Sequence, residues 1–437
     1  MAKRHADRVG DWESLFLRME ELVLANSGQD EFEEIYKLVI AKLWDERCGK
    51  PNRFKSCGSE AETFQAIGAL LSEAESAWPG VLERSSTSLL TPNHLDVCVQ
   101  ALARHKICDA GVSVMDSFFE FLVARGAKGA KGQFFTPRYV VEFCVRMLQP
   151  RATESVLDPA CGSGGFLIHT LNHWVQNDSL GTAAAVKECS SSRLWGFDVD
   201  ARALRVAKAL MVLAGGDAAN LIQLNSLLKP ETAGPSLFES DPEAGSVLTI
   251  EDVCRSRMRH HKGFDVILTN PPFAGDVQEK HVLNAYHVSH GKSRFERDVL
   301  FLERCIELLR PGGRMAIVLP HNKFAMGAYA HVRQWVLRNA RVLAVVGLGR
   351  HTFLPHTHQK ASILFAQKNR ERSHTPKSDR IFFAVSERDG KNSKGQLVNR
   401  PGMNISDSLW ERVDQDLAEI VTGFQEFCGT ESLVFRG

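Results

Sequence analysis

The chain has 437 residues, which at roughly 100–200 residues per domain predicts two to four folded units. Its composition, 44% hydrophobic and 24% charged, is that of a globular protein. Lys and Arg number 53 and Asp and Glu 52, so the formal charge of +1 excludes the strongly basic balance of a protein that holds nucleic acid unaided. No apolar run approaches the roughly 20 residues that cross a bilayer, and the first residues lead into acidic sequence rather than a signal peptide. We therefore expect a cytoplasmic protein without membrane contact.

The ten cysteines are scattered along the chain without a C-x-x-C pair. In a chain of this length they are typical of reduced thiols rather than of a disulfide or zinc framework. His356 and His358, or His287 and His290, have the spacing of metal-ligand pairs. No carboxylate or Cys partner completes either set in the sequence, so we predict no metal site.

The first part of the chain has the pattern of amphipathic helices. Apolar residues recur at helical spacing over residues 12–44, with acids between them, which predicts two helices. Further helices are predicted over residues 60–75 and 96–124. A glycine- and lysine-rich stretch, residues 125–132, ends this region. We predict an all-helical N-terminal domain over residues 1–127.

The pattern then changes to short β-branched or apolar runs that alternate with helices. Predicted strands are residues 155–157, 194–197, 221–224, 266–269, 315–319, 342–346 and 362–365. The helices predicted between them are the crossovers that parallel strand pairs require. This order predicts an α/β, doubly wound sheet within a domain over residues 128–368. Residues 177–192 and 229–262 are rich in Ser, Gly, Glu and Pro, which predicts surface insertions. A strand at 381–385 and a helix at 409–427 form a C-terminal extension over residues 369–437.

A glycine-rich turn follows the first predicted strand. It runs from Asp158 through Pro-Ala-Cys to Gly162, Ser163, Gly164 and Gly165, where a helix begins. Glycines at this position let the backbone approach a ligand, and the helix N-terminus offers unpaired N–H groups. The acid four residues before Gly162 would repel a diphosphate but suits an ammonium group, which favours S-adenosylmethionine over NAD. The alternative is a structural strand-to-helix turn.

Polar residues end the next two predicted strands. Asp198 ends the second strand, where a carboxylate can accept hydrogen bonds from both hydroxyls of a ribose. Asn225 follows the third strand and is placed to meet the amine of an adenine ring; a plain turn is an equal alternative. The sequence therefore predicts a nucleoside-like cofactor along these strand ends.

The fourth predicted strand ends in Asn270-Pro271-Pro272-Phe273. The two prolines fix φ and lack amide donors, so the turn is rigid and presents carbonyl oxygens. The Asn270 side-chain oxygen and the Pro271 carbonyl can bind the two hydrogens of an exocyclic amine, which then attacks the sulfonium methyl in line. Phe273 would stack on a base flipped out of its helix. The alternative is a simple strand terminator.

These two motifs, with Gly132-Gln-Phe-Phe-Thr-Pro137 before the first, resemble the adenine-N6 DNA methyltransferases, above all the modification subunit of type I restriction-modification systems. The resemblance covers about residues 118–365 and implies a Rossmann-like methyltransferase sheet. It implies that the following residues line the methionine end of the cofactor: Gln133, Phe134, Phe135, Thr136, Pro137 and Arg138. It also places Ser163 to Gly165 at the cofactor centre, Asp198 at its ribose and Asn270 to Phe273 at the target adenine. From the residues alone, Thr136 is the N-cap and Pro137 the first turn of a helix.

The resemblance also implies the partners. They are double-stranded DNA with a flipped adenine, a specificity subunit, a restriction subunit and a second methyltransferase subunit, with the helical domain clamping DNA or docking a subunit. Residues 353–365 lie near the base pocket by resemblance, where Lys360 could contact a phosphate or lie in solvent. The sequence departs from the family in the irregular residues 229–262 and in having no base-reading domain after Phe365, so we expect another chain to recognise the DNA sequence.

Three other functions were weighed against adenine-N6 methylation. Asn-Pro-Pro-aromatic turns also serve methylation of protein glutamine amides and of RNA, but the Gly132–Pro137 block and the helical domain argue against these acceptors. A non-catalytic scaffold on DNA would not need Asn270 and Asp198. Cytosine-C5 methylation needs a Pro-Cys nucleophile, and the chain has no such dipeptide.

Overall fold

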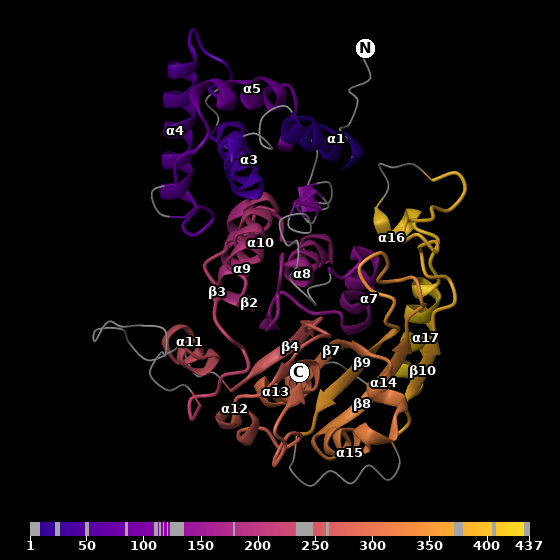
Figure 1. Ribbon diagram of the computed structural model, residues 1–437. Coiled ribbons are helices and arrows are strands. Elements are labelled where there is room, and N and C mark those ends of the chain that lie inside the picture. The colour runs from indigo at the N-terminus through magenta and orange to yellow at the C-terminus, as the bar shows by residue number, and fades with distance from the viewer. Residues whose placement is uncertain are drawn as a thin grey trace. The chain divides into compact units, whose positions relative to one another are not determined.

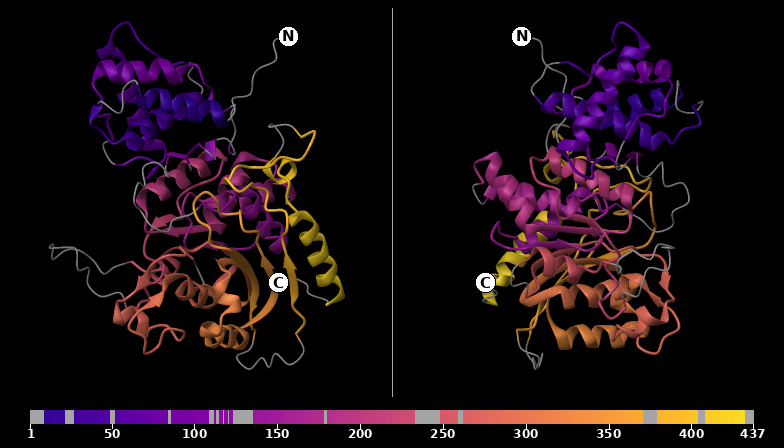
Figure 2. Two further views of the ribbon diagram at one scale, coloured as in Figure 1. Left: turned by 45° about the vertical axis from the view of Figure 1, so that its right-hand side comes forward. Right: turned by 90° about the vertical axis from the view of Figure 1, so that its left-hand side faces the viewer.

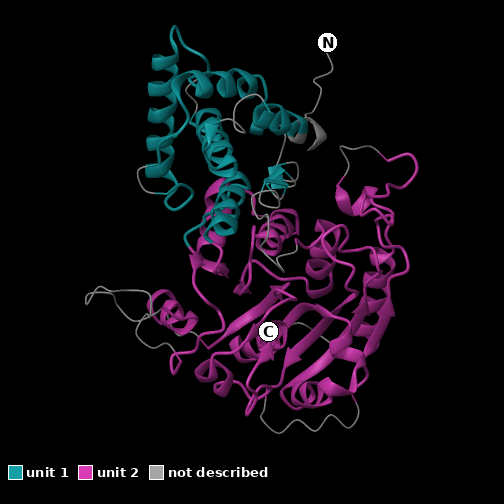
Figure 3. Ribbon diagram, viewed as in Figure 1, with its two compact units in different colours: residues 1–130, 201–219 teal, residues 131–200, 220–437 magenta. Residues whose placement is uncertain are grey.

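The computed structural model describes residues 9–21, 27–48, 52–83, 86–108, 112, 115–116, 118–119, 121–122, 135–177, 180–232, 248–258, 262–370, 379–403 and 408–431. The chain divides into two compact units, residues 1–130 with 201–219, and residues 131–200 with 220–437 (Figure 3). The division at residues 127 and 368 stays a prediction. None of the described helices is both long and apolar enough to cross a bilayer.

The first unit is built from helices. They are α1 (Val9–Met19), α3 (Glu31–Arg47), α4 (Glu60–Ala77), α5 (Pro92–Ala103) and α10 (Ala201–Leu213). Asp30, Ser59 and Thr91 cap α3, α4 and α5 by accepting a hydrogen bond from the N–H three residues later. The long helix predicted over 96–124 is wrong in its bounds, because α5 begins at Pro92 and ends at Ala103.

Helix α10 belongs to this helical unit although it follows a strand of the sheet. Tyr36 in α3 is fully buried, and its hydroxyl lies 2.9 Å from the carbonyl oxygen of Arg205. Arg205 also forms a two-point ion pair with Glu33. Arg47 Nη1 donates to the carbonyl oxygen of Val212 at 2.8 Å, near the end of α10. The contact of Arg47 satisfies a carbonyl in the last turn of α10, which lacks a partner within the helix.

The second unit contains a sheet of eight strands in the order β10-β8-β9-β7-β4-β1-β2-β3. The strands are β1 (Val156–Asp158), β2 (Leu194–Asp198), β3 (Leu221–Gln223), β4 (Phe264–Thr269), β7 (Leu309–Pro320), β8 (Ala340–Gly347), β9 (Ala361–Lys368) and β10 (Phe382–Val385). All neighbouring pairs are parallel except those of β9, which runs antiparallel to β7 and β8. Among the described strands, β9 is thus the one antiparallel strand of this sheet. Residues 348–360 contain no crossover helix, and a parallel return needs one.

Helices cover both faces of this sheet, as predicted for a doubly wound α/β fold. Helices α7 (Arg138–Leu148), α8 (Gly165–Asn177) and α17 (Leu417–Thr430) pack on one another and on the sheet, as do α13 (Arg297–Leu308) and α15 (Ala330–Asn339) (Figures 1 and 2). The β1–β2 and β4–β7 crossovers move in opposite directions along the sheet, so right-handed connections place α8 and α13 on opposite faces. Leu157, Ile267 and Met315 are fully buried in the core between them.

The predicted insertions contain regular structure. Helix α9 (Ala183–Arg193) occupies most of residues 177–192, and α11 (Ile250–Arg257) lies in the second insertion. A reciprocal capping box between Thr249 and Asp252 begins α11. The remaining short elements are β5 (Asp276–Val277), α12 (Lys280–Asn284), β6 (Phe295–Glu296), α14 (Asn322–Ala325), η2 (Gly327–Tyr329) and α16 (Leu409–Arg412). The helix predicted over 409–427 is two helices, because α16 ends at Arg412 and α17 begins at Leu417.

Candidate active site

The glycine-rich turn connects β1 to α8 at the carboxyl edge of the sheet. Gly162 and Gly164 have φ of +51° and +83°, the left-handed region that favours glycine. The N–H of Cys161 donates to the carbonyl oxygen of Phe197 at 3.0 Å, which attaches the turn to β2. Asp158, the last residue of β1, is 1% exposed and accepts a hydrogen bond of 3.1 Å from the N–H of Ala160.

Asp198 lies beside this turn. Its Oδ2 accepts a hydrogen bond of 2.8 Å from the N–H of Gly162, and its Oδ1 accepts one of 2.9 Å from the N–H of Asp200. Each carboxylate oxygen keeps a lone pair that a ribose hydroxyl could use. The carboxylate that was predicted to meet the ribose therefore also fixes the glycine turn.

Both carboxyl groups are less acidic than usual. Burial raises the pKa of Asp158 to about 7, and the negative charge of Asp198 adds to this shift. Burial also raises the pKa of Asp198, although backbone N–H groups of Asp200 and Gly162 oppose the rise. A buried acid next to a second acid is stabilised in its charged form by a cation. These two groups therefore suit a positively charged ligand.

A pocket opens between the glycine turn, the start of α7 and the end of β4. Its lining consists of Phe135, Thr136, Arg138, Val141, Asp158, Ala160, Cys161, Gly162, Ser163, Gly165, Phe166 and Asn270. The two sequence motifs, separated by more than 100 residues, thus meet at one cavity. Parallel strands bring their carboxyl ends to the same edge of a sheet, which explains why residues so far apart in the chain line it.

Arg138 closes one wall of the pocket. The residue is 8% exposed, and its Nη2 donates to Ser163 Oγ at 3.0 Å. A Cβ placed on Gly165 would lie 1.7 Å from Arg138 Nη1, so only glycine leaves room for this guanidinium. A buried guanidinium at a pocket suits a carboxylate ligand, to which it can donate two parallel hydrogen bonds.

Thr136 has a different role from the helix cap that was predicted. Helix α7 begins at Arg138, its N-cap is Pro137, and no side chain caps it. The Thr136 hydroxyl instead accepts a hydrogen bond of 2.9 Å from Asn270 Nδ2. The prediction that Pro137 forms the first turn is also wrong by one residue. The cap prediction for Thr136 failed because it considered only neighbouring residues, whereas the hydroxyl binds a residue 134 positions away.

Asn270 directly follows β4 and lines the pocket. Asn270 Oδ1 is buried and accepts no hydrogen bond from the described residues. Leaving such an acceptor unpaired costs about 1–3 kcal/mol, so a ligand with an N–H donor is expected there. Pro271 is buried and Pro272 is partly exposed, which makes the turn after β4 rigid.

Phe273 contacts an aromatic residue that the sequence did not single out as a site residue. The rings of Phe273 and Phe353 form an edge-to-face pair with centroids 5.7 Å apart and an angle of 66°. Phe353 lies in the loop after β8 and is 2% exposed. In the same segment the sequence indicated Lys360 as a residue near the base pocket. The backbone oxygen of Lys360 accepts the N–H of His321, and its side chain is exposed. An aromatic residue in a loop after a strand end is the signal that could have identified Phe353.

The other predicted site residues lie elsewhere or beyond the described chain. Gln133 and Phe134 are outside the described residues. Gly164 lies in the glycine turn and Asp198 lies beside it, but neither residue lines the pocket. Asn225 is exposed, and its Oδ1 accepts a hydrogen bond of 3.1 Å from the N–H of Leu227. Their roles toward a cofactor stay predictions.

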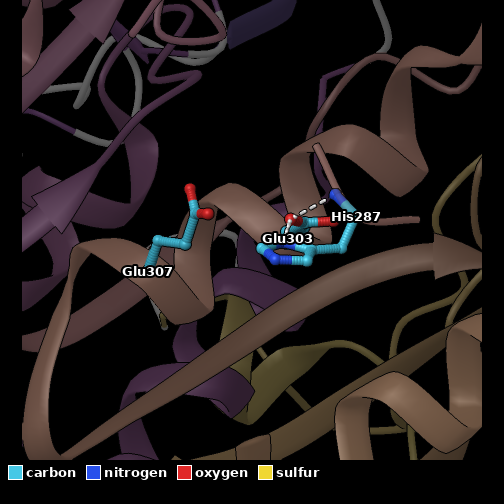
Figure 4. A group of neighbouring side chains, drawn as sticks. All are labelled: His287, Glu303 and Glu307. Carbon is cyan, nitrogen blue, oxygen red and sulfur yellow. Dashed lines mark hydrogen bonds and ion pairs between the residues drawn. The ribbon is translucent and has the colours of Figure 1, made fainter. Parts of the chain in front are cut away.

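A separate cluster joins His287, Glu303 and Glu307 (Figure 4). His287 thus has a carboxylate partner, Glu303, which the sequence did not reveal, at 2.9 Å from its Nδ1. Glu303 is buried and accepts the backbone N–H groups of His287 and Val288 at 2.8 and 2.9 Å. Glu307 pairs with Lys229 Nζ at 2.7 Å. Protein donors already occupy both carboxylates, so the cluster anchors residues 287–288 on α13.

Comparison with known proteins relates the chain to restriction-modification enzymes. It is 29% identical over 255 residues to the type I restriction enzyme EcoEI methylase subunit of Escherichia coli. The aligned residues make up 58% of this chain and 46% of that protein. The StySPI methylase subunit of Salmonella potsdam is 25% identical over 246 residues, 56% of this chain and 42% of that protein. The chain spans about half the length of these curated relatives.

The fold matches as well. The type I restriction-modification system methyltransferase subunit from Streptococcus thermophilus superposes with a TM-score of 0.56 at 15% identity, covering 96% of this chain and 94% of that one. At this identity the likeness shows the fold alone. Residues 112–428, well over half of the sequence, match the family described as N-6 DNA methylase. The chain therefore belongs to the N-6 DNA methylase family.

Proposed function

We propose that the protein transfers a methyl group from S-adenosylmethionine to the N6 amine of adenine in DNA. It acts as the methyltransferase subunit of a type I-like restriction-modification system and relies on a separate specificity subunit. The observation that carries this proposal is the buried, unpaired Asn270 Oδ1 in the same pocket as the glycine turn. Family membership supports it.

The residues of the pocket fit S-adenosylmethionine. When bound, this cofactor supplies an electrophilic methyl group on a sulfonium. Arg138 and Ser163 suit its carboxylate, and the buried carboxyl of Asp158 suits its positive charges. Asp198 suits the ribose hydroxyls, since both of its oxygens have accepting capacity left. Phe135, Thr136, Gly162 and Gly165 line the same cavity.

The turn after β4 acts on the acceptor. Asn270 Oδ1 and the carbonyl oxygen of Pro271 accept the two hydrogens of an adenine amine, which orients the nitrogen lone pair for an in-line attack. Phe273 packs on the face of the flipped base. Thr136 keeps Nδ2 of Asn270 occupied, so that the oxygen is the atom left for the amine. Catalysis then depends on orientation, without a covalent enzyme intermediate.

The partners follow from the same proposal. Double-stranded DNA with one flipped adenine is the substrate, and a specificity subunit recognises its sequence. A second methyltransferase subunit and a restriction subunit complete the assembly. The helical unit clamps DNA or docks a subunit. The relatives described above are named as restriction-enzyme methylases, and this favours DNA over RNA or a protein glutamine amide as the acceptor.

The proposal is tested with the chain purified together with the specificity protein encoded beside it. We expect labelled methyl groups to appear on adenine N6 in unmodified DNA. Asn270→Ala should abolish transfer while calorimetry still detects S-adenosylmethionine binding, because Asn270 contacts the acceptor amine. Asn177→Ala, at the exposed end of α8, is the matched control, and its methyl transfer and cofactor binding should equal those of the wild type. Methylation of RNA or protein alone, or loss of cofactor binding in Asn270→Ala, contradicts the assignment.

A further inference from the structure

The segment after β10 reaches back to the helix that begins at the pocket. Strand β10 ends at Val385, and the chain then turns at Asp389 and Gly390. The backbone oxygen of Asp389 accepts a hydrogen bond of 2.7 Å from Tyr139 Oη. Tyr139 is buried and directly follows Arg138 in α7. The turn at Asp389 is therefore attached to the wall that holds the buried guanidinium.

The side chain of Asp389 binds a second element, the loop between β8 and β9. Its Oδ2 accepts the backbone N–H of His351 at 2.7 Å and lies 3.0 Å from His351 Nδ1. A Cβ placed on Gly349 would lie 1.3 Å from Asp389 Oδ1, so the glycine allows this close approach. Lys391 Nζ donates to the carbonyl oxygen of Leu354 at 2.7 Å. The segment after β10 thus holds this loop at two points.

The same loop carries Phe353, whose ring meets the edge or face of Phe273. Phe353 is buried between the two attachment points at His351 and Leu354. Phe273 is partly buried, and Phe353 is an aromatic neighbour that packs against its ring. A displacement of the loop would move the aromatic pair next to the Asn270 turn.

We propose that Asp389 is a positioning residue that fixes the Phe353 loop relative to α7 and thereby sets the position of Phe273 at the acceptor site. This inference rests on the proposed function, because the acceptor site is what the residue positions. Asp389 joins the two elements by separate groups, its carbonyl oxygen toward Tyr139 and its carboxylate toward His351. Removing the carboxylate releases one of the two attachments of the loop and leaves the contact with α7 intact.

The test compares three variants of the full-length chain in complex with its specificity partner. Asp389→Ala should lower kcat roughly 10- to 100-fold, since small misplacements of a reacting group have effects of that size. The dissociation constant of S-adenosylmethionine should change less than about twofold, because Arg138 and Ser163 are not displaced. Asp389→Asn should recover most of kcat, since its amide oxygen still accepts the His351 N–H. Glu387→Ala, exposed in the same segment, is the matched control and should leave kcat unchanged.

Amide hydrogen exchange provides a measurement that does not depend on activity. In Asp389→Ala, exchange of residues 349–354 should rise, whereas exchange in Glu387→Ala should equal that of the wild type. Unchanged exchange of this loop overturns the inference. The inference is also overturned if kcat and cofactor affinity fall by the same factor in Asp389→Ala. If Asp389→Ala does not fold, Asp389→Ser, which also lacks the carboxylate, replaces it: raised exchange of the loop supports the inference, and unchanged exchange refutes it. A wild-type complex that transfers no methyl group contradicts the proposed function, and the exchange result still decides the role of Asp389.

Discussion

Replacing Thr136 by Val separates the orientation of Asn270 from the shape of the pocket. The Thr136 hydroxyl accepts Asn270 Nδ2 at 2.9 Å, and Thr136 is 7% exposed. Valine fills nearly the same space but has no acceptor, so Asn270 Nδ2 loses a partly buried hydrogen bond. Removing one partner of such a hydrogen bond costs about 1–3 kcal/mol of folding free energy. The free energy of unfolding should fall by this amount.

The substitution should also slow catalysis. Once Nδ2 has lost the Thr136 hydroxyl, the amide can rotate, and rotation replaces the accepting oxygen by a donor at the place proposed for the adenine amine. A misplacement of about 1 Å at a reacting group costs about 100-fold in rate. We therefore expect kcat to fall about 100-fold in Thr136→Val. Thr136→Ser keeps the hydroxyl and should retain most of the activity.

The assay combines single-turnover methyl transfer with calorimetric titration of S-adenosylmethionine and urea unfolding. These three measurements separate chemistry, cofactor binding and stability. A Thr136→Val enzyme whose transfer rate stays within about twofold of the wild type would refute the orientation argument. An increase in the cofactor dissociation constant as large as the fall in rate would instead show that Thr136 acts on the cofactor and not through Asn270.

Three further substitutions test the cofactor side of the pocket. Burial raises the pKa of Asp158 to about 7, so the folded, ligand-free protein holds a proton that the unfolded chain has already lost. Its stability should therefore fall as pH rises from about 4 to about 7, by up to roughly 4 kcal/mol; Asp158→Asn should remove this slope in urea unfolding and weaken cofactor binding. Asp198→Ala should weaken cofactor affinity by roughly 1–3 kcal/mol, and unchanged affinity in calorimetry would exclude a ribose contact. Gly165→Ala should displace Arg138 from Ser163 and weaken cofactor binding roughly tenfold, whereas an unchanged dissociation constant would show that the guanidinium is not needed.

The two strand-end motifs show what sequence reasoning could establish. Asp158 and Asn270 each end a run of apolar residues, and both runs are strands in neighbouring positions of one sheet. Topology rules for parallel strands then place both ends at one edge without further information. The pocket that contains Asp158 and Asn270 follows from this local pattern and the topology rules.

Contacts between segments that are distant in the sequence could not be predicted by this reasoning. Thr136 has the sequence signature of a helix cap. In the structure its hydroxyl instead accepts a hydrogen bond from Asn270 Nδ2, a tertiary contact that the local sequence does not reveal. The direction of strand β9 was not predicted, because an apolar run does not show which way its strand runs in a sheet. Phe353 and Asp389 lie in irregular segments whose position depends on that strand.

The antiparallel course of β9 has a consequence for the site. A parallel β9 would require a crossover helix between β8 and β9, and the chain would then leave the carboxyl edge of the sheet. Because β9 runs back beside β8, the connection, residues 348–360, stays at the edge where β4 ends in Asn270. Phe353 in this connection can therefore meet Phe273, and Asp389, which follows the parallel strand β10 at the same edge, can bind the connection. The reversal of one strand thus brings Phe353 to Phe273 beside the Asn270 turn, and a parallel strand in its place could not.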